Sequence, residues 1–343
     1  MELRFTVFAD LHYKTGMYAP GVEDLSVILF RAACDRSDFL LHCGDFSNDY
    51  AGSPELWRPY LQNPFGLPVY GVYGNHELET PGNTMAVVTP LLTNDDSVLW
   101  GTADGTRGDG SIAYYSADRG PFRILCTDTN YSLNPATGAW EHNRPASWGA
   151  PAGNQRENSL GPAQLSWLEG MVADAAEKKM HCIVVGHDSF SGIWGTSPDG
   201  ARVREIFRRA NQTAPGTVVL AINGHYHTDH TAGSEGVVWF DVNTAINGYW
   251  SPDVTDHYDA SHTFRMTEYD DNGRPAAERM ESLGSLSMGR NTWFFTAPLS
   301  ALVTVDEKGS VTIRGTKTAW CYGVEPPPDG ASPEIADASF VRS

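Results

Sequence analysis

Short polar motifs, each placed directly after an apolar run, constrain this 343-residue chain more than any other feature of its sequence. The apolar runs have the length and the aliphatic and aromatic content of buried strands. All but the first motif begin with a glycine, and such a glycine lets the chain turn sharply so that side chains can point into one site. The motifs are Asp10-Leu11-His12, Gly44-Asp45, Gly74-Asn75-His76-Glu77, Gly186-His187 and Gly224-His225-Tyr226-His227.

The order of the elements around these motifs predicts an α/β architecture. In an open α/β sheet the carboxyl ends of the strands form one rim, so residues that follow the strands converge there. We therefore expect the motifs to meet in space although they are far apart in the sequence. The pattern predicts strands at Leu3–Ala9, Phe39–Cys43 and Pro68–Tyr73, with helices at Val22–Ala33 and Glu55–Leu61 between them.

The rest of the chain predicts further strands and helices. Residues 131 to about 160 lack periodicity and predict a long loop, of a kind that is often functional. Antiparallel strands are expected later, with a hairpin turn at Glu307-Lys308-Gly309. The predicted strands are Ser97–Trp100, Ile112–Ser116, Phe122–Cys126, His181–Val185, Val218–Ile222, Gly236–Asn243, Phe264–Tyr269, Ala301–Asp306 and Ser310–Arg314, and the predicted helices begin at Gly161 and span Ala201–Ala210.

The residue types in the motifs suit a pair of metal ions. Two neighbouring divalent ions need an anion between them, and Asp45 is the natural candidate for that bridge. Imidazoles and a carboxamide oxygen complete the coordination of borderline metals such as Mn, Fe, Zn or Co. Each motif alone is common in turns and on surfaces. All of them in one chain, each after a strand, indicate a two-metal site.

The charge of the chain narrows the classes of partner. The formal net charge is −18 and the sequence pI is about 4.9. Such a surface repels polyphosphate backbones, so we expect no nucleic-acid polymer as a partner. A small anionic substrate remains compatible if metal ions reverse the local potential.

Cysteine usage and the chain ends favour a cytoplasmic protein. Five cysteines are present, none of them at CxxC spacing, and Cys43, Cys126 and Cys182 fall in apolar runs that predict buried core thiols. A reducing compartment is expected from this usage. No leader-like segment precedes the first strand, although a leader removed beforehand would leave the same sequence. No run reaches the ~18 apolar residues that span a bilayer.

Together the motifs resemble the signature of the calcineurin-like metallophosphoesterases, which reads D-x-H, G-D-x-x-[D/N/Y], G-N-H-[D/E], G-H or H-H, and G-H-x-H. They extend over residues 10 to 227. The resemblance implies a four-layer αββα sandwich of two mixed β-sheets flanked by helices. On this basis we expect a catalytic core over residues 1–250, a C-terminal β-rich extension over 251–325 packed on the core, and a flexible tail over 326–343.

The resemblance also implies roles for individual residues. Asp45 would bridge two metal ions, a hydroxide bridging the same ions would attack phosphorus, and His76 would lie beside the phosphoryl group as a general acid or a transition-state stabiliser. The ligands of one ion would be Asp10, His12 and His227, and those of the other Asn75, His187 and His225.

The residue at position 48, shortly after the second motif, differs between the branches of this family. Protein Ser/Thr phosphatases have Asp followed by Arg there, and purple acid phosphatases have an iron-binding Tyr. This chain has Asn48-Asp49. It is most similar to the bacterial cyclic-nucleotide phosphodiesterase-like branch, which commonly has Asp at this position. Asn48 could accept a hydrogen bond from the His76 ring but could not neutralise an imidazolium.

Further residues are candidates for supporting the site or lining it. Glu77 follows His76 and is expected to support the ligands rather than to react. Aromatic side chains on rim loops could stack on a nucleobase or a sugar, and covering the core is the alternative for each of them. The candidates for substrate contact are Tyr13, Asn48, His142 and Trp194, with Trp140, Trp148 and Tyr249-Trp250 as further rim aromatics.

These expectations define a hydrolase of phosphate esters. A phosphodiesterase acting on small, nucleotide-like substrates is the leading interpretation. A phosphomonoesterase and a pyrophosphatase acting on nucleotide conjugates share the same motifs. A non-catalytic metal-binding scaffold is the least favoured, because every expected ligand and His76 are present.

Overall fold

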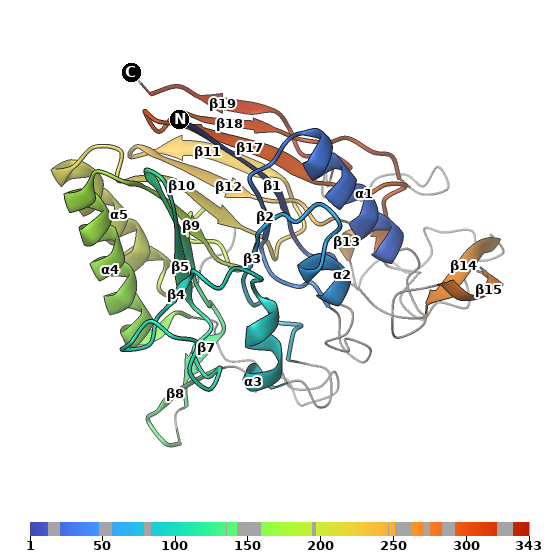
Figure 1. Ribbon diagram of the computed structural model, residues 1–343, viewed down its shortest axis with the longest axis horizontal. Helices are drawn as coiled ribbons and strands as arrows, with labels where there is room; N and C mark the ends of the chain where they lie inside the picture. The colour runs from blue at the N-terminus through green and yellow to red at the C-terminus, as the bar shows by residue number, and fades with distance from the viewer. Residues whose placement is uncertain are drawn as a thin grey trace.

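Two mixed β-sheets form the centre of the molecule in the computed structural model (Figure 1). The structure describes residues 1–12, 21–47, 57–78, 84–134, 136–142, 159–193, 197–245, 247–250, 263–269, 275–282, 292–320 and 332–342. The first sheet has the strand order β19-β18-β17-β1-β2-β3, and the second has the order β11-β12-β10-β9-β6-β5-β4. In the first sheet β1, β2 and β3 run parallel, and in the second β6, β9, β10 and β12 do.

The strands are short and their bounds are as follows. The first sheet contains β1 (Glu2–Phe8), β2 (Phe39–His42), β3 (Val69–Gly71), β17 (Ala301–Asp306), β18 (Val311–Arg314) and β19 (Ala338–Phe340). The second contains β4 (Leu99–Trp100), β5 (Tyr115–Arg119), β6 (Phe122–Cys126), β9 (His181–Val185), β10 (Val218–Asn223), β11 (His230–Ser234) and β12 (Val237–Asp241). Two-stranded sheets are formed by β7 (Tyr131–Leu133) with β8 (Trp140–His142), β13 (Asn247–Trp250) with β16 (Thr292–Phe294), and β14 (Thr263–Tyr269) with β15 (Pro275–Ser282).

Helices cover the outer faces of the sheets. Helices α4 (Gly161–Lys178) and α5 (Gly200–Thr213) lie side by side against the second sheet, while α1 (Gly21–Cys34) lies beside β1 (Figure 1). The short helices α2 (Arg58–Leu61) and α3 (Met85–Val88) follow farther along the chain. This arrangement confirms the predicted class, with two mixed sheets flanked by helices.

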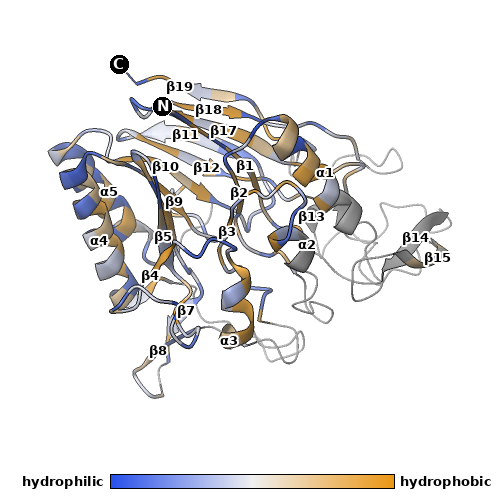
Figure 2. Cartoon of the chain, in the orientation of Figure 1, coloured by the Kyte–Doolittle hydropathy of each residue, from blue (hydrophilic) through white to orange (hydrophobic). Residues whose placement is uncertain are grey.

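The apolar core lies on both sides of the second sheet. One buried cluster joins the facing sides of the two sheets, with Phe5, Phe39 and Ile124 among its members. A second cluster lies between the second sheet and helices α4 and α5, and includes Leu168 and Phe207. Figure 2 shows apolar colouring along the central strands and polar colouring on α5. Burial of apolar side chains on both faces explains why the central strands have continuous rather than alternating hydrophobic patterns.

The C-terminal strands complete the first sheet. Strand β17 pairs antiparallel with β1, with Phe5 opposite Val303, and β18 and β19 extend the same sheet. The prediction of a flexible tail is therefore wrong for residues 332–342, where β19 pairs with β18. A three-residue strand at a sheet edge gives too short a pattern to recognise in the sequence. The domain boundary at residue 250 stays a prediction.

Other segments also differ from the prediction. The long loop expected after residue 131 begins with the antiparallel hairpin β7–β8, whose polar and exposed residues gave no strand signal. Strand β5 lies at Tyr115–Arg119 rather than at Ile112–Ser116, because its last residues, Asp118 and Arg119, are polar and partly exposed. The bounds predicted for β6, β9 and β17 are confirmed.

Two further expectations concern the cysteine thiols and membrane-spanning helices. Cys43, Cys126 and Cys182 are buried free thiols, as predicted, and Cys34 is an exposed free thiol. Cys321 lies outside the described residues. Within those residues, no helix combines the length and apolarity that crossing a bilayer would require.

Candidate metal centre

The rims of the two sheets meet where the polar motifs lie. Ala9, directly after β1, forms a parallel bridge with Thr244, which follows β12. The amide of Asp10 donates to the carbonyl of Gly44 at 3.0 Å. The amide of Gly224 donates to the carbonyl of His187, also at 3.0 Å. These backbone contacts bring segments from both sheets to one place, as the strand order predicts.

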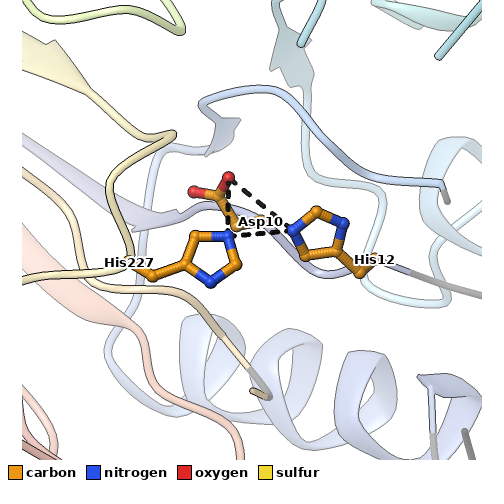
Figure 3. Close-up of side chains that lie close together, drawn as sticks. All are labelled: Asp10, His12 and His227. Atoms are coloured by element: carbon orange, nitrogen blue, oxygen red, sulfur yellow. Dashed lines mark hydrogen bonds and ion pairs between the residues drawn. The ribbon is translucent and has the colours of Figure 1, made fainter. Parts of the chain in front are cut away.

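One group of side chains consists of Asp10, His12 and His227. The Nε2 atoms of His12 and His227 are 3.0 Å apart. The Oδ1 atom of Asp10 lies 3.5 Å from the Nε2 atom of His227 and 3.9 Å from that of His12. All three side chains point toward one another (Figure 3). We call this group the Asp10 half.

A second group gathers around His187 and defines the Asn75 half, which consists of Asn75, His187 and His225. The Nε2 atom of His187 lies 3.1 Å from Oδ1 of Asn75 and 3.2 Å from Nδ1 of His225. The Nδ1 atom of His187 donates to the carbonyl oxygen of Cys43 at 2.8 Å. That bond leaves the Nε2 atom free to face its neighbours, as in metal-bound histidines held by a backbone carbonyl.

Asp45 lies between the two halves. Its Oδ2 atom is 3.2 Å from Nε2 of His187 and 3.8 Å from Nε2 of His76. Ligand atoms of Asp45, His187 and His225 lie within 4.8 Å of one another, and so do those of Asp45, His12 and His76. A carboxylate that belongs to both sets can join two ions. We call the two halves together with Asp45 the candidate centre.

The candidate centre depends on an unusual backbone conformation at its own side chains. Positive φ angles are rare for residues other than glycine, yet they occur at five of the seven residues of the centre. Such conformations persist only where the surrounding structure imposes them, and they cluster at functional sites. These residues are Asp10 (φ 50), His12 (φ 47), Asp45 (φ 53), His225 (φ 75) and His227 (φ 55).

The motif glycines are required because they lack a side chain. A Cβ atom on Gly74 would lie 2.0 Å from Oδ1 of Asp45, and one on Gly224 would lie 2.7 Å from Oδ2 of Asp10. A Cβ atom on Gly44, which also has a φ of +93°, would lie 2.4 Å from Nδ1 of His187. The glycines therefore let carboxylate and imidazole groups approach the backbone, in addition to the turning role expected from the sequence.

Glu77 holds two of the motif loops together. Its buried carboxylate accepts the backbone N–H groups of Asp45 at 3.1 Å, Phe46 at 2.6 Å and Ser47 at 3.2 Å, and also that of Gly74. Burial, together with the neighbouring Asp45, raises the pKa of Glu77 to about 7. Glu77 therefore supports Asp45 and the segment of Asn75 and His76 through backbone contacts.

The protonation of the histidines follows from burial and from the carboxylates. Burial lowers the pKa of His12 to about 3 and also lowers that of His225. Burial opposes a charge on His187 as well, but Asp45 is close enough to raise its pKa well above the ordinary value. Burial would raise the pKa of Asp45, and His187 and His76 instead lower it well below its usual range. Metal binding requires neutral imidazole, so an ion would displace the proton of His187.

The residues present fit a pair of metal ions. Metal–nitrogen bonds of ~2.0–2.1 Å place neighbouring ligand atoms roughly 2.9–3.4 Å apart in octahedral or tetrahedral coordination. Several separations within each half lie in this range, including 3.0 Å between His12 and His227 and 3.1 Å between His187 and Asn75. A bound cation would stabilise two imidazole nitrogens that lie 3.0 Å apart beside a carboxylate.

Of the predicted substrate residues, His142 lies on the hairpin β7–β8, and most of the others are outside the described residues. The side chain of His142 is 7% exposed, and its Nε2 atom lies 3.0 Å from Oδ2 of Asp128. Tyr13, Asn48, Trp148 and Trp194 are outside the described residues. His230 lies 3.8 Å from Asp241, and the Oδ2 atom of Asp229 accepts the N–H of Ala336. The Asp128–His142 pair had no motif to identify it in the sequence.

Comparisons with known proteins identify the family of this chain. Residues 3–229 match the family model described as calcineurin-like phosphoesterase. A dimetal phosphatase from Danio rerio is 13% identical, with 99% of each chain covered and a TM-score of 0.58. GAP50, the anchor in the inner membrane complex of Plasmodium, is 13% identical, with 99% of this chain and 88% of that chain covered and a TM-score of 0.46. No curated protein is significantly similar to this chain.

Proposed function

The chain belongs to the calcineurin-like phosphoesterase family and is a metal-dependent phosphoester hydrolase, and on that basis we propose that it hydrolyses a small phosphodiester at two metal ions held by the candidate centre. The observation that carries the proposal is the position of Asp45, whose carboxylate is shared by the ligand sets on either side. Asp10, His12 and His227 would hold one ion and Asn75, His187 and His225 the other.

The chemistry of such a pair suits phosphate esters. When bound, two ions neutralise the charge of the phosphoryl group and supply an activated water. Mn, Fe, Zn and Co all match a donor set of imidazole nitrogens with carboxylate and carboxamide oxygens. The positive φ angles and the buried backbone contacts fix these donors before an ion arrives. Such preorganisation lowers the cost of binding and of orienting the substrate.

The position of His76 beside Asp45 and His12 supports a role for it in the reaction. Its backbone N–H donates to Oδ1 of Asp45 at 2.9 Å, and its ring lies edge-on to that of His12 with centroids 5.0 Å apart. The side chain keeps 16% of its surface exposed, so a substrate can reach it. In our proposal His76 donates a proton to the leaving oxygen or a hydrogen bond to the phosphoryl group.

The acidity of the chain favours a diester over a monoester. A phosphomonoester carries up to two negative charges and gains more from a guanidinium clamp than a singly charged diester does. The formal net charge of −18 also disfavours a polyanionic substrate.

A matched substrate panel tests the proposal. Bis-p-nitrophenyl phosphate, p-nitrophenyl phosphate and a nucleotide-conjugate pyrophosphate would be compared at saturating Mn²⁺, by kcat/KM. We expect the diester to have the highest value. A higher value for the monoester would assign a phosphomonoesterase, and a higher value for the conjugate would assign a pyrophosphatase. Either result would replace the diesterase proposal while keeping the family.

A further inference from the structure

A close contact between a carboxylate and an imidazole lies near the Asn75 half without touching its ligands. His142 lies at the end of hairpin β7–β8, and its Nε2 atom is 3.0 Å from Oδ2 of Asp128. Asp128 lies two residues after the end of β6. The ring of His142 packs against Tyr73, with centroids 5.1 Å apart, and against Tyr131 at 5.4 Å. Asp128 is fully buried. A buried carboxylate has to be compensated by the polar groups to which it is connected.

The first connection leads from this pair to Asn75. The Oδ1 atom of Asp128 accepts the backbone N–H of Asn130 at 3.0 Å, and the side-chain amide of Asn130 donates to the carbonyl oxygen of Tyr73 at 3.2 Å. Tyr73 directly precedes the Gly74-Asn75-His76 segment. The ring of His142 also packs on Tyr73, so both members of the pair fix the start of this segment.

The second connection leads to His225. The hydroxyl of Thr129, the residue after Asp128, donates to Oδ2 of Asp188 at 2.9 Å. The Oδ1 atom of Asp188 lies 3.7 Å from Nε2 of His225. Gln164 on α4 anchors Asp128 from the other side, because it donates to the carbonyl of Asp128 and accepts its N–H, both at 2.7 Å. The pair therefore belongs to a rigid, buried network that ends on the Asn75 half.

We propose that Asp128 and His142 form a positioning pair for the Asn75 half of the metal centre, acting through Tyr73 and Asp188 on Asn75 and His225. This inference rests on the proposed function, because it assumes that the Asn75 half binds an ion. Partners behind metal ligands commonly contribute 10–100-fold to metal affinity or activity. The contacts described above lead to Asn75 and His225, so we expect the larger effect of the pair on that half.

A two-step Mn²⁺ titration by calorimetry provides a readout that does not depend on turnover. In His142→Phe, which keeps a ring between Tyr73 and Tyr131 but loses the ring nitrogen that faces Asp128, one dissociation constant rises about 10-fold. The other constant changes by less than about twofold. The affected step is the one that His187→Ala abolishes. Asp128→Asn gives the same pattern, and His142→Gln, which keeps an N–H donor, restores most of the affinity.

Arg123→Met is the matched control. Arg123 is a buried cation near the start of β6, paired with Asp118 at 2.7 Å and Asp174 at 2.6 Å, away from the centre. Its substitution lowers the melting temperature and leaves both Mn²⁺ constants unchanged. Unchanged constants in both His142→Phe and Asp128→Asn, or an equal loss at both steps, would overturn the positioning role. A parent chain that binds two ions but cleaves no phosphodiester would refute the proposed function alone, and binding of fewer than two ions would refute both.

Discussion

The Oδ2 atom of Asp45 lies 3.2 Å from the Nε2 atom of His187, and both side chains are buried. Because burial removes both groups from bulk water, the carboxylate and the imidazole depend on each other or on an ion between them. The same oxygen lies 3.8 Å from His76. Asp45 therefore connects the candidate centre, the supporting loops and the proposed proton donor.

Replacement of Asp45 tests its bridging role. In Asp45→Asn the shared anion is lost, so the two ions repel each other and one of them binds weakly. We expect turnover to fall by more than about 100-fold, beyond the usual cost of losing an outer partner of a ligand. Metal analysis of the purified protein should find close to one ion per chain. Asp174→Asn, on α4 and outside the candidate centre, is the control, and full turnover with two ions in Asp45→Asn would refute the role.

Replacement of His76 separates proton donation from metal binding. His76→Ala should keep both ions and lose about 10²–10⁴-fold in kcat, the usual contribution of a general acid. The loss should be largest for alkyl leaving groups, which need a proton, and smallest for p-nitrophenolate, which does not. A measurement of kcat across leaving groups of different pKa tests this. An equal loss for all leaving groups would assign His76 to phosphoryl stabilisation instead.

Glu77 should affect stability even without metal. In Glu77→Gln an amide donor replaces one carboxylate oxygen and opposes the backbone N–H groups that this oxygen accepts. A buried donor left without an acceptor costs about 1–3 kcal/mol. Urea unfolding in the presence of chelator should show a loss of this size. Glu141→Gln, on an exposed strand, is the control, and equal stability of the Glu77 variant and the parent would contradict the role of its backbone contacts.

Asp241 should make the protein less stable as the pH rises. Burial raises its pKa to about 7, with a further contribution from Asp229. The folded state therefore holds a proton that the unfolded chain releases above ~3.9. The resulting stability is present below that pH and is lost as the pH rises toward 7. Melting temperatures in chelator between pH 4 and 8 should fall less steeply for Asp241→Asn than for the parent, and parallel curves would contradict the assignment.

Most of the sheet framework could be predicted from the sequence, because the central strands are apolar on both faces. The bounds of β6, β9 and β17 were predictable for this reason. Strand β11 has the sequence His-Thr-Ala-Gly-Ser and is partly exposed, so no hydrophobic pattern identified it. The hairpin β7–β8 was missed on the same grounds. Its place in the structure depends on tertiary contacts such as that of His142 with Asp128.

The residues of the candidate centre could be predicted because each follows a strand within a short motif. The contacts that support these residues could not be predicted from the sequence. The positive φ angles of Asp10 and His225 arise from contacts between segments more than 200 residues apart, such as the His225 N–H donated to Oδ2 of Asp10 at 3.0 Å. Position 74 requires glycine because the Asp45 carboxylate lies against it, and a local sequence pattern does not show that contact. Side-chain contacts between distant segments are set by the fold as a whole.

The most direct test of the central claim is to remove the metal and return it in measured amounts. Chelated, dialysed protein should lose activity toward bis-p-nitrophenyl phosphate. Stepwise addition of Mn²⁺, Zn²⁺, Fe²⁺ or Co²⁺ in separate experiments should restore it with at least one of these metals, with a plateau at two ions per chain. Activity that survives chelation, or that reaches its plateau at one ion per chain, would contradict a two-metal centre at Asp45.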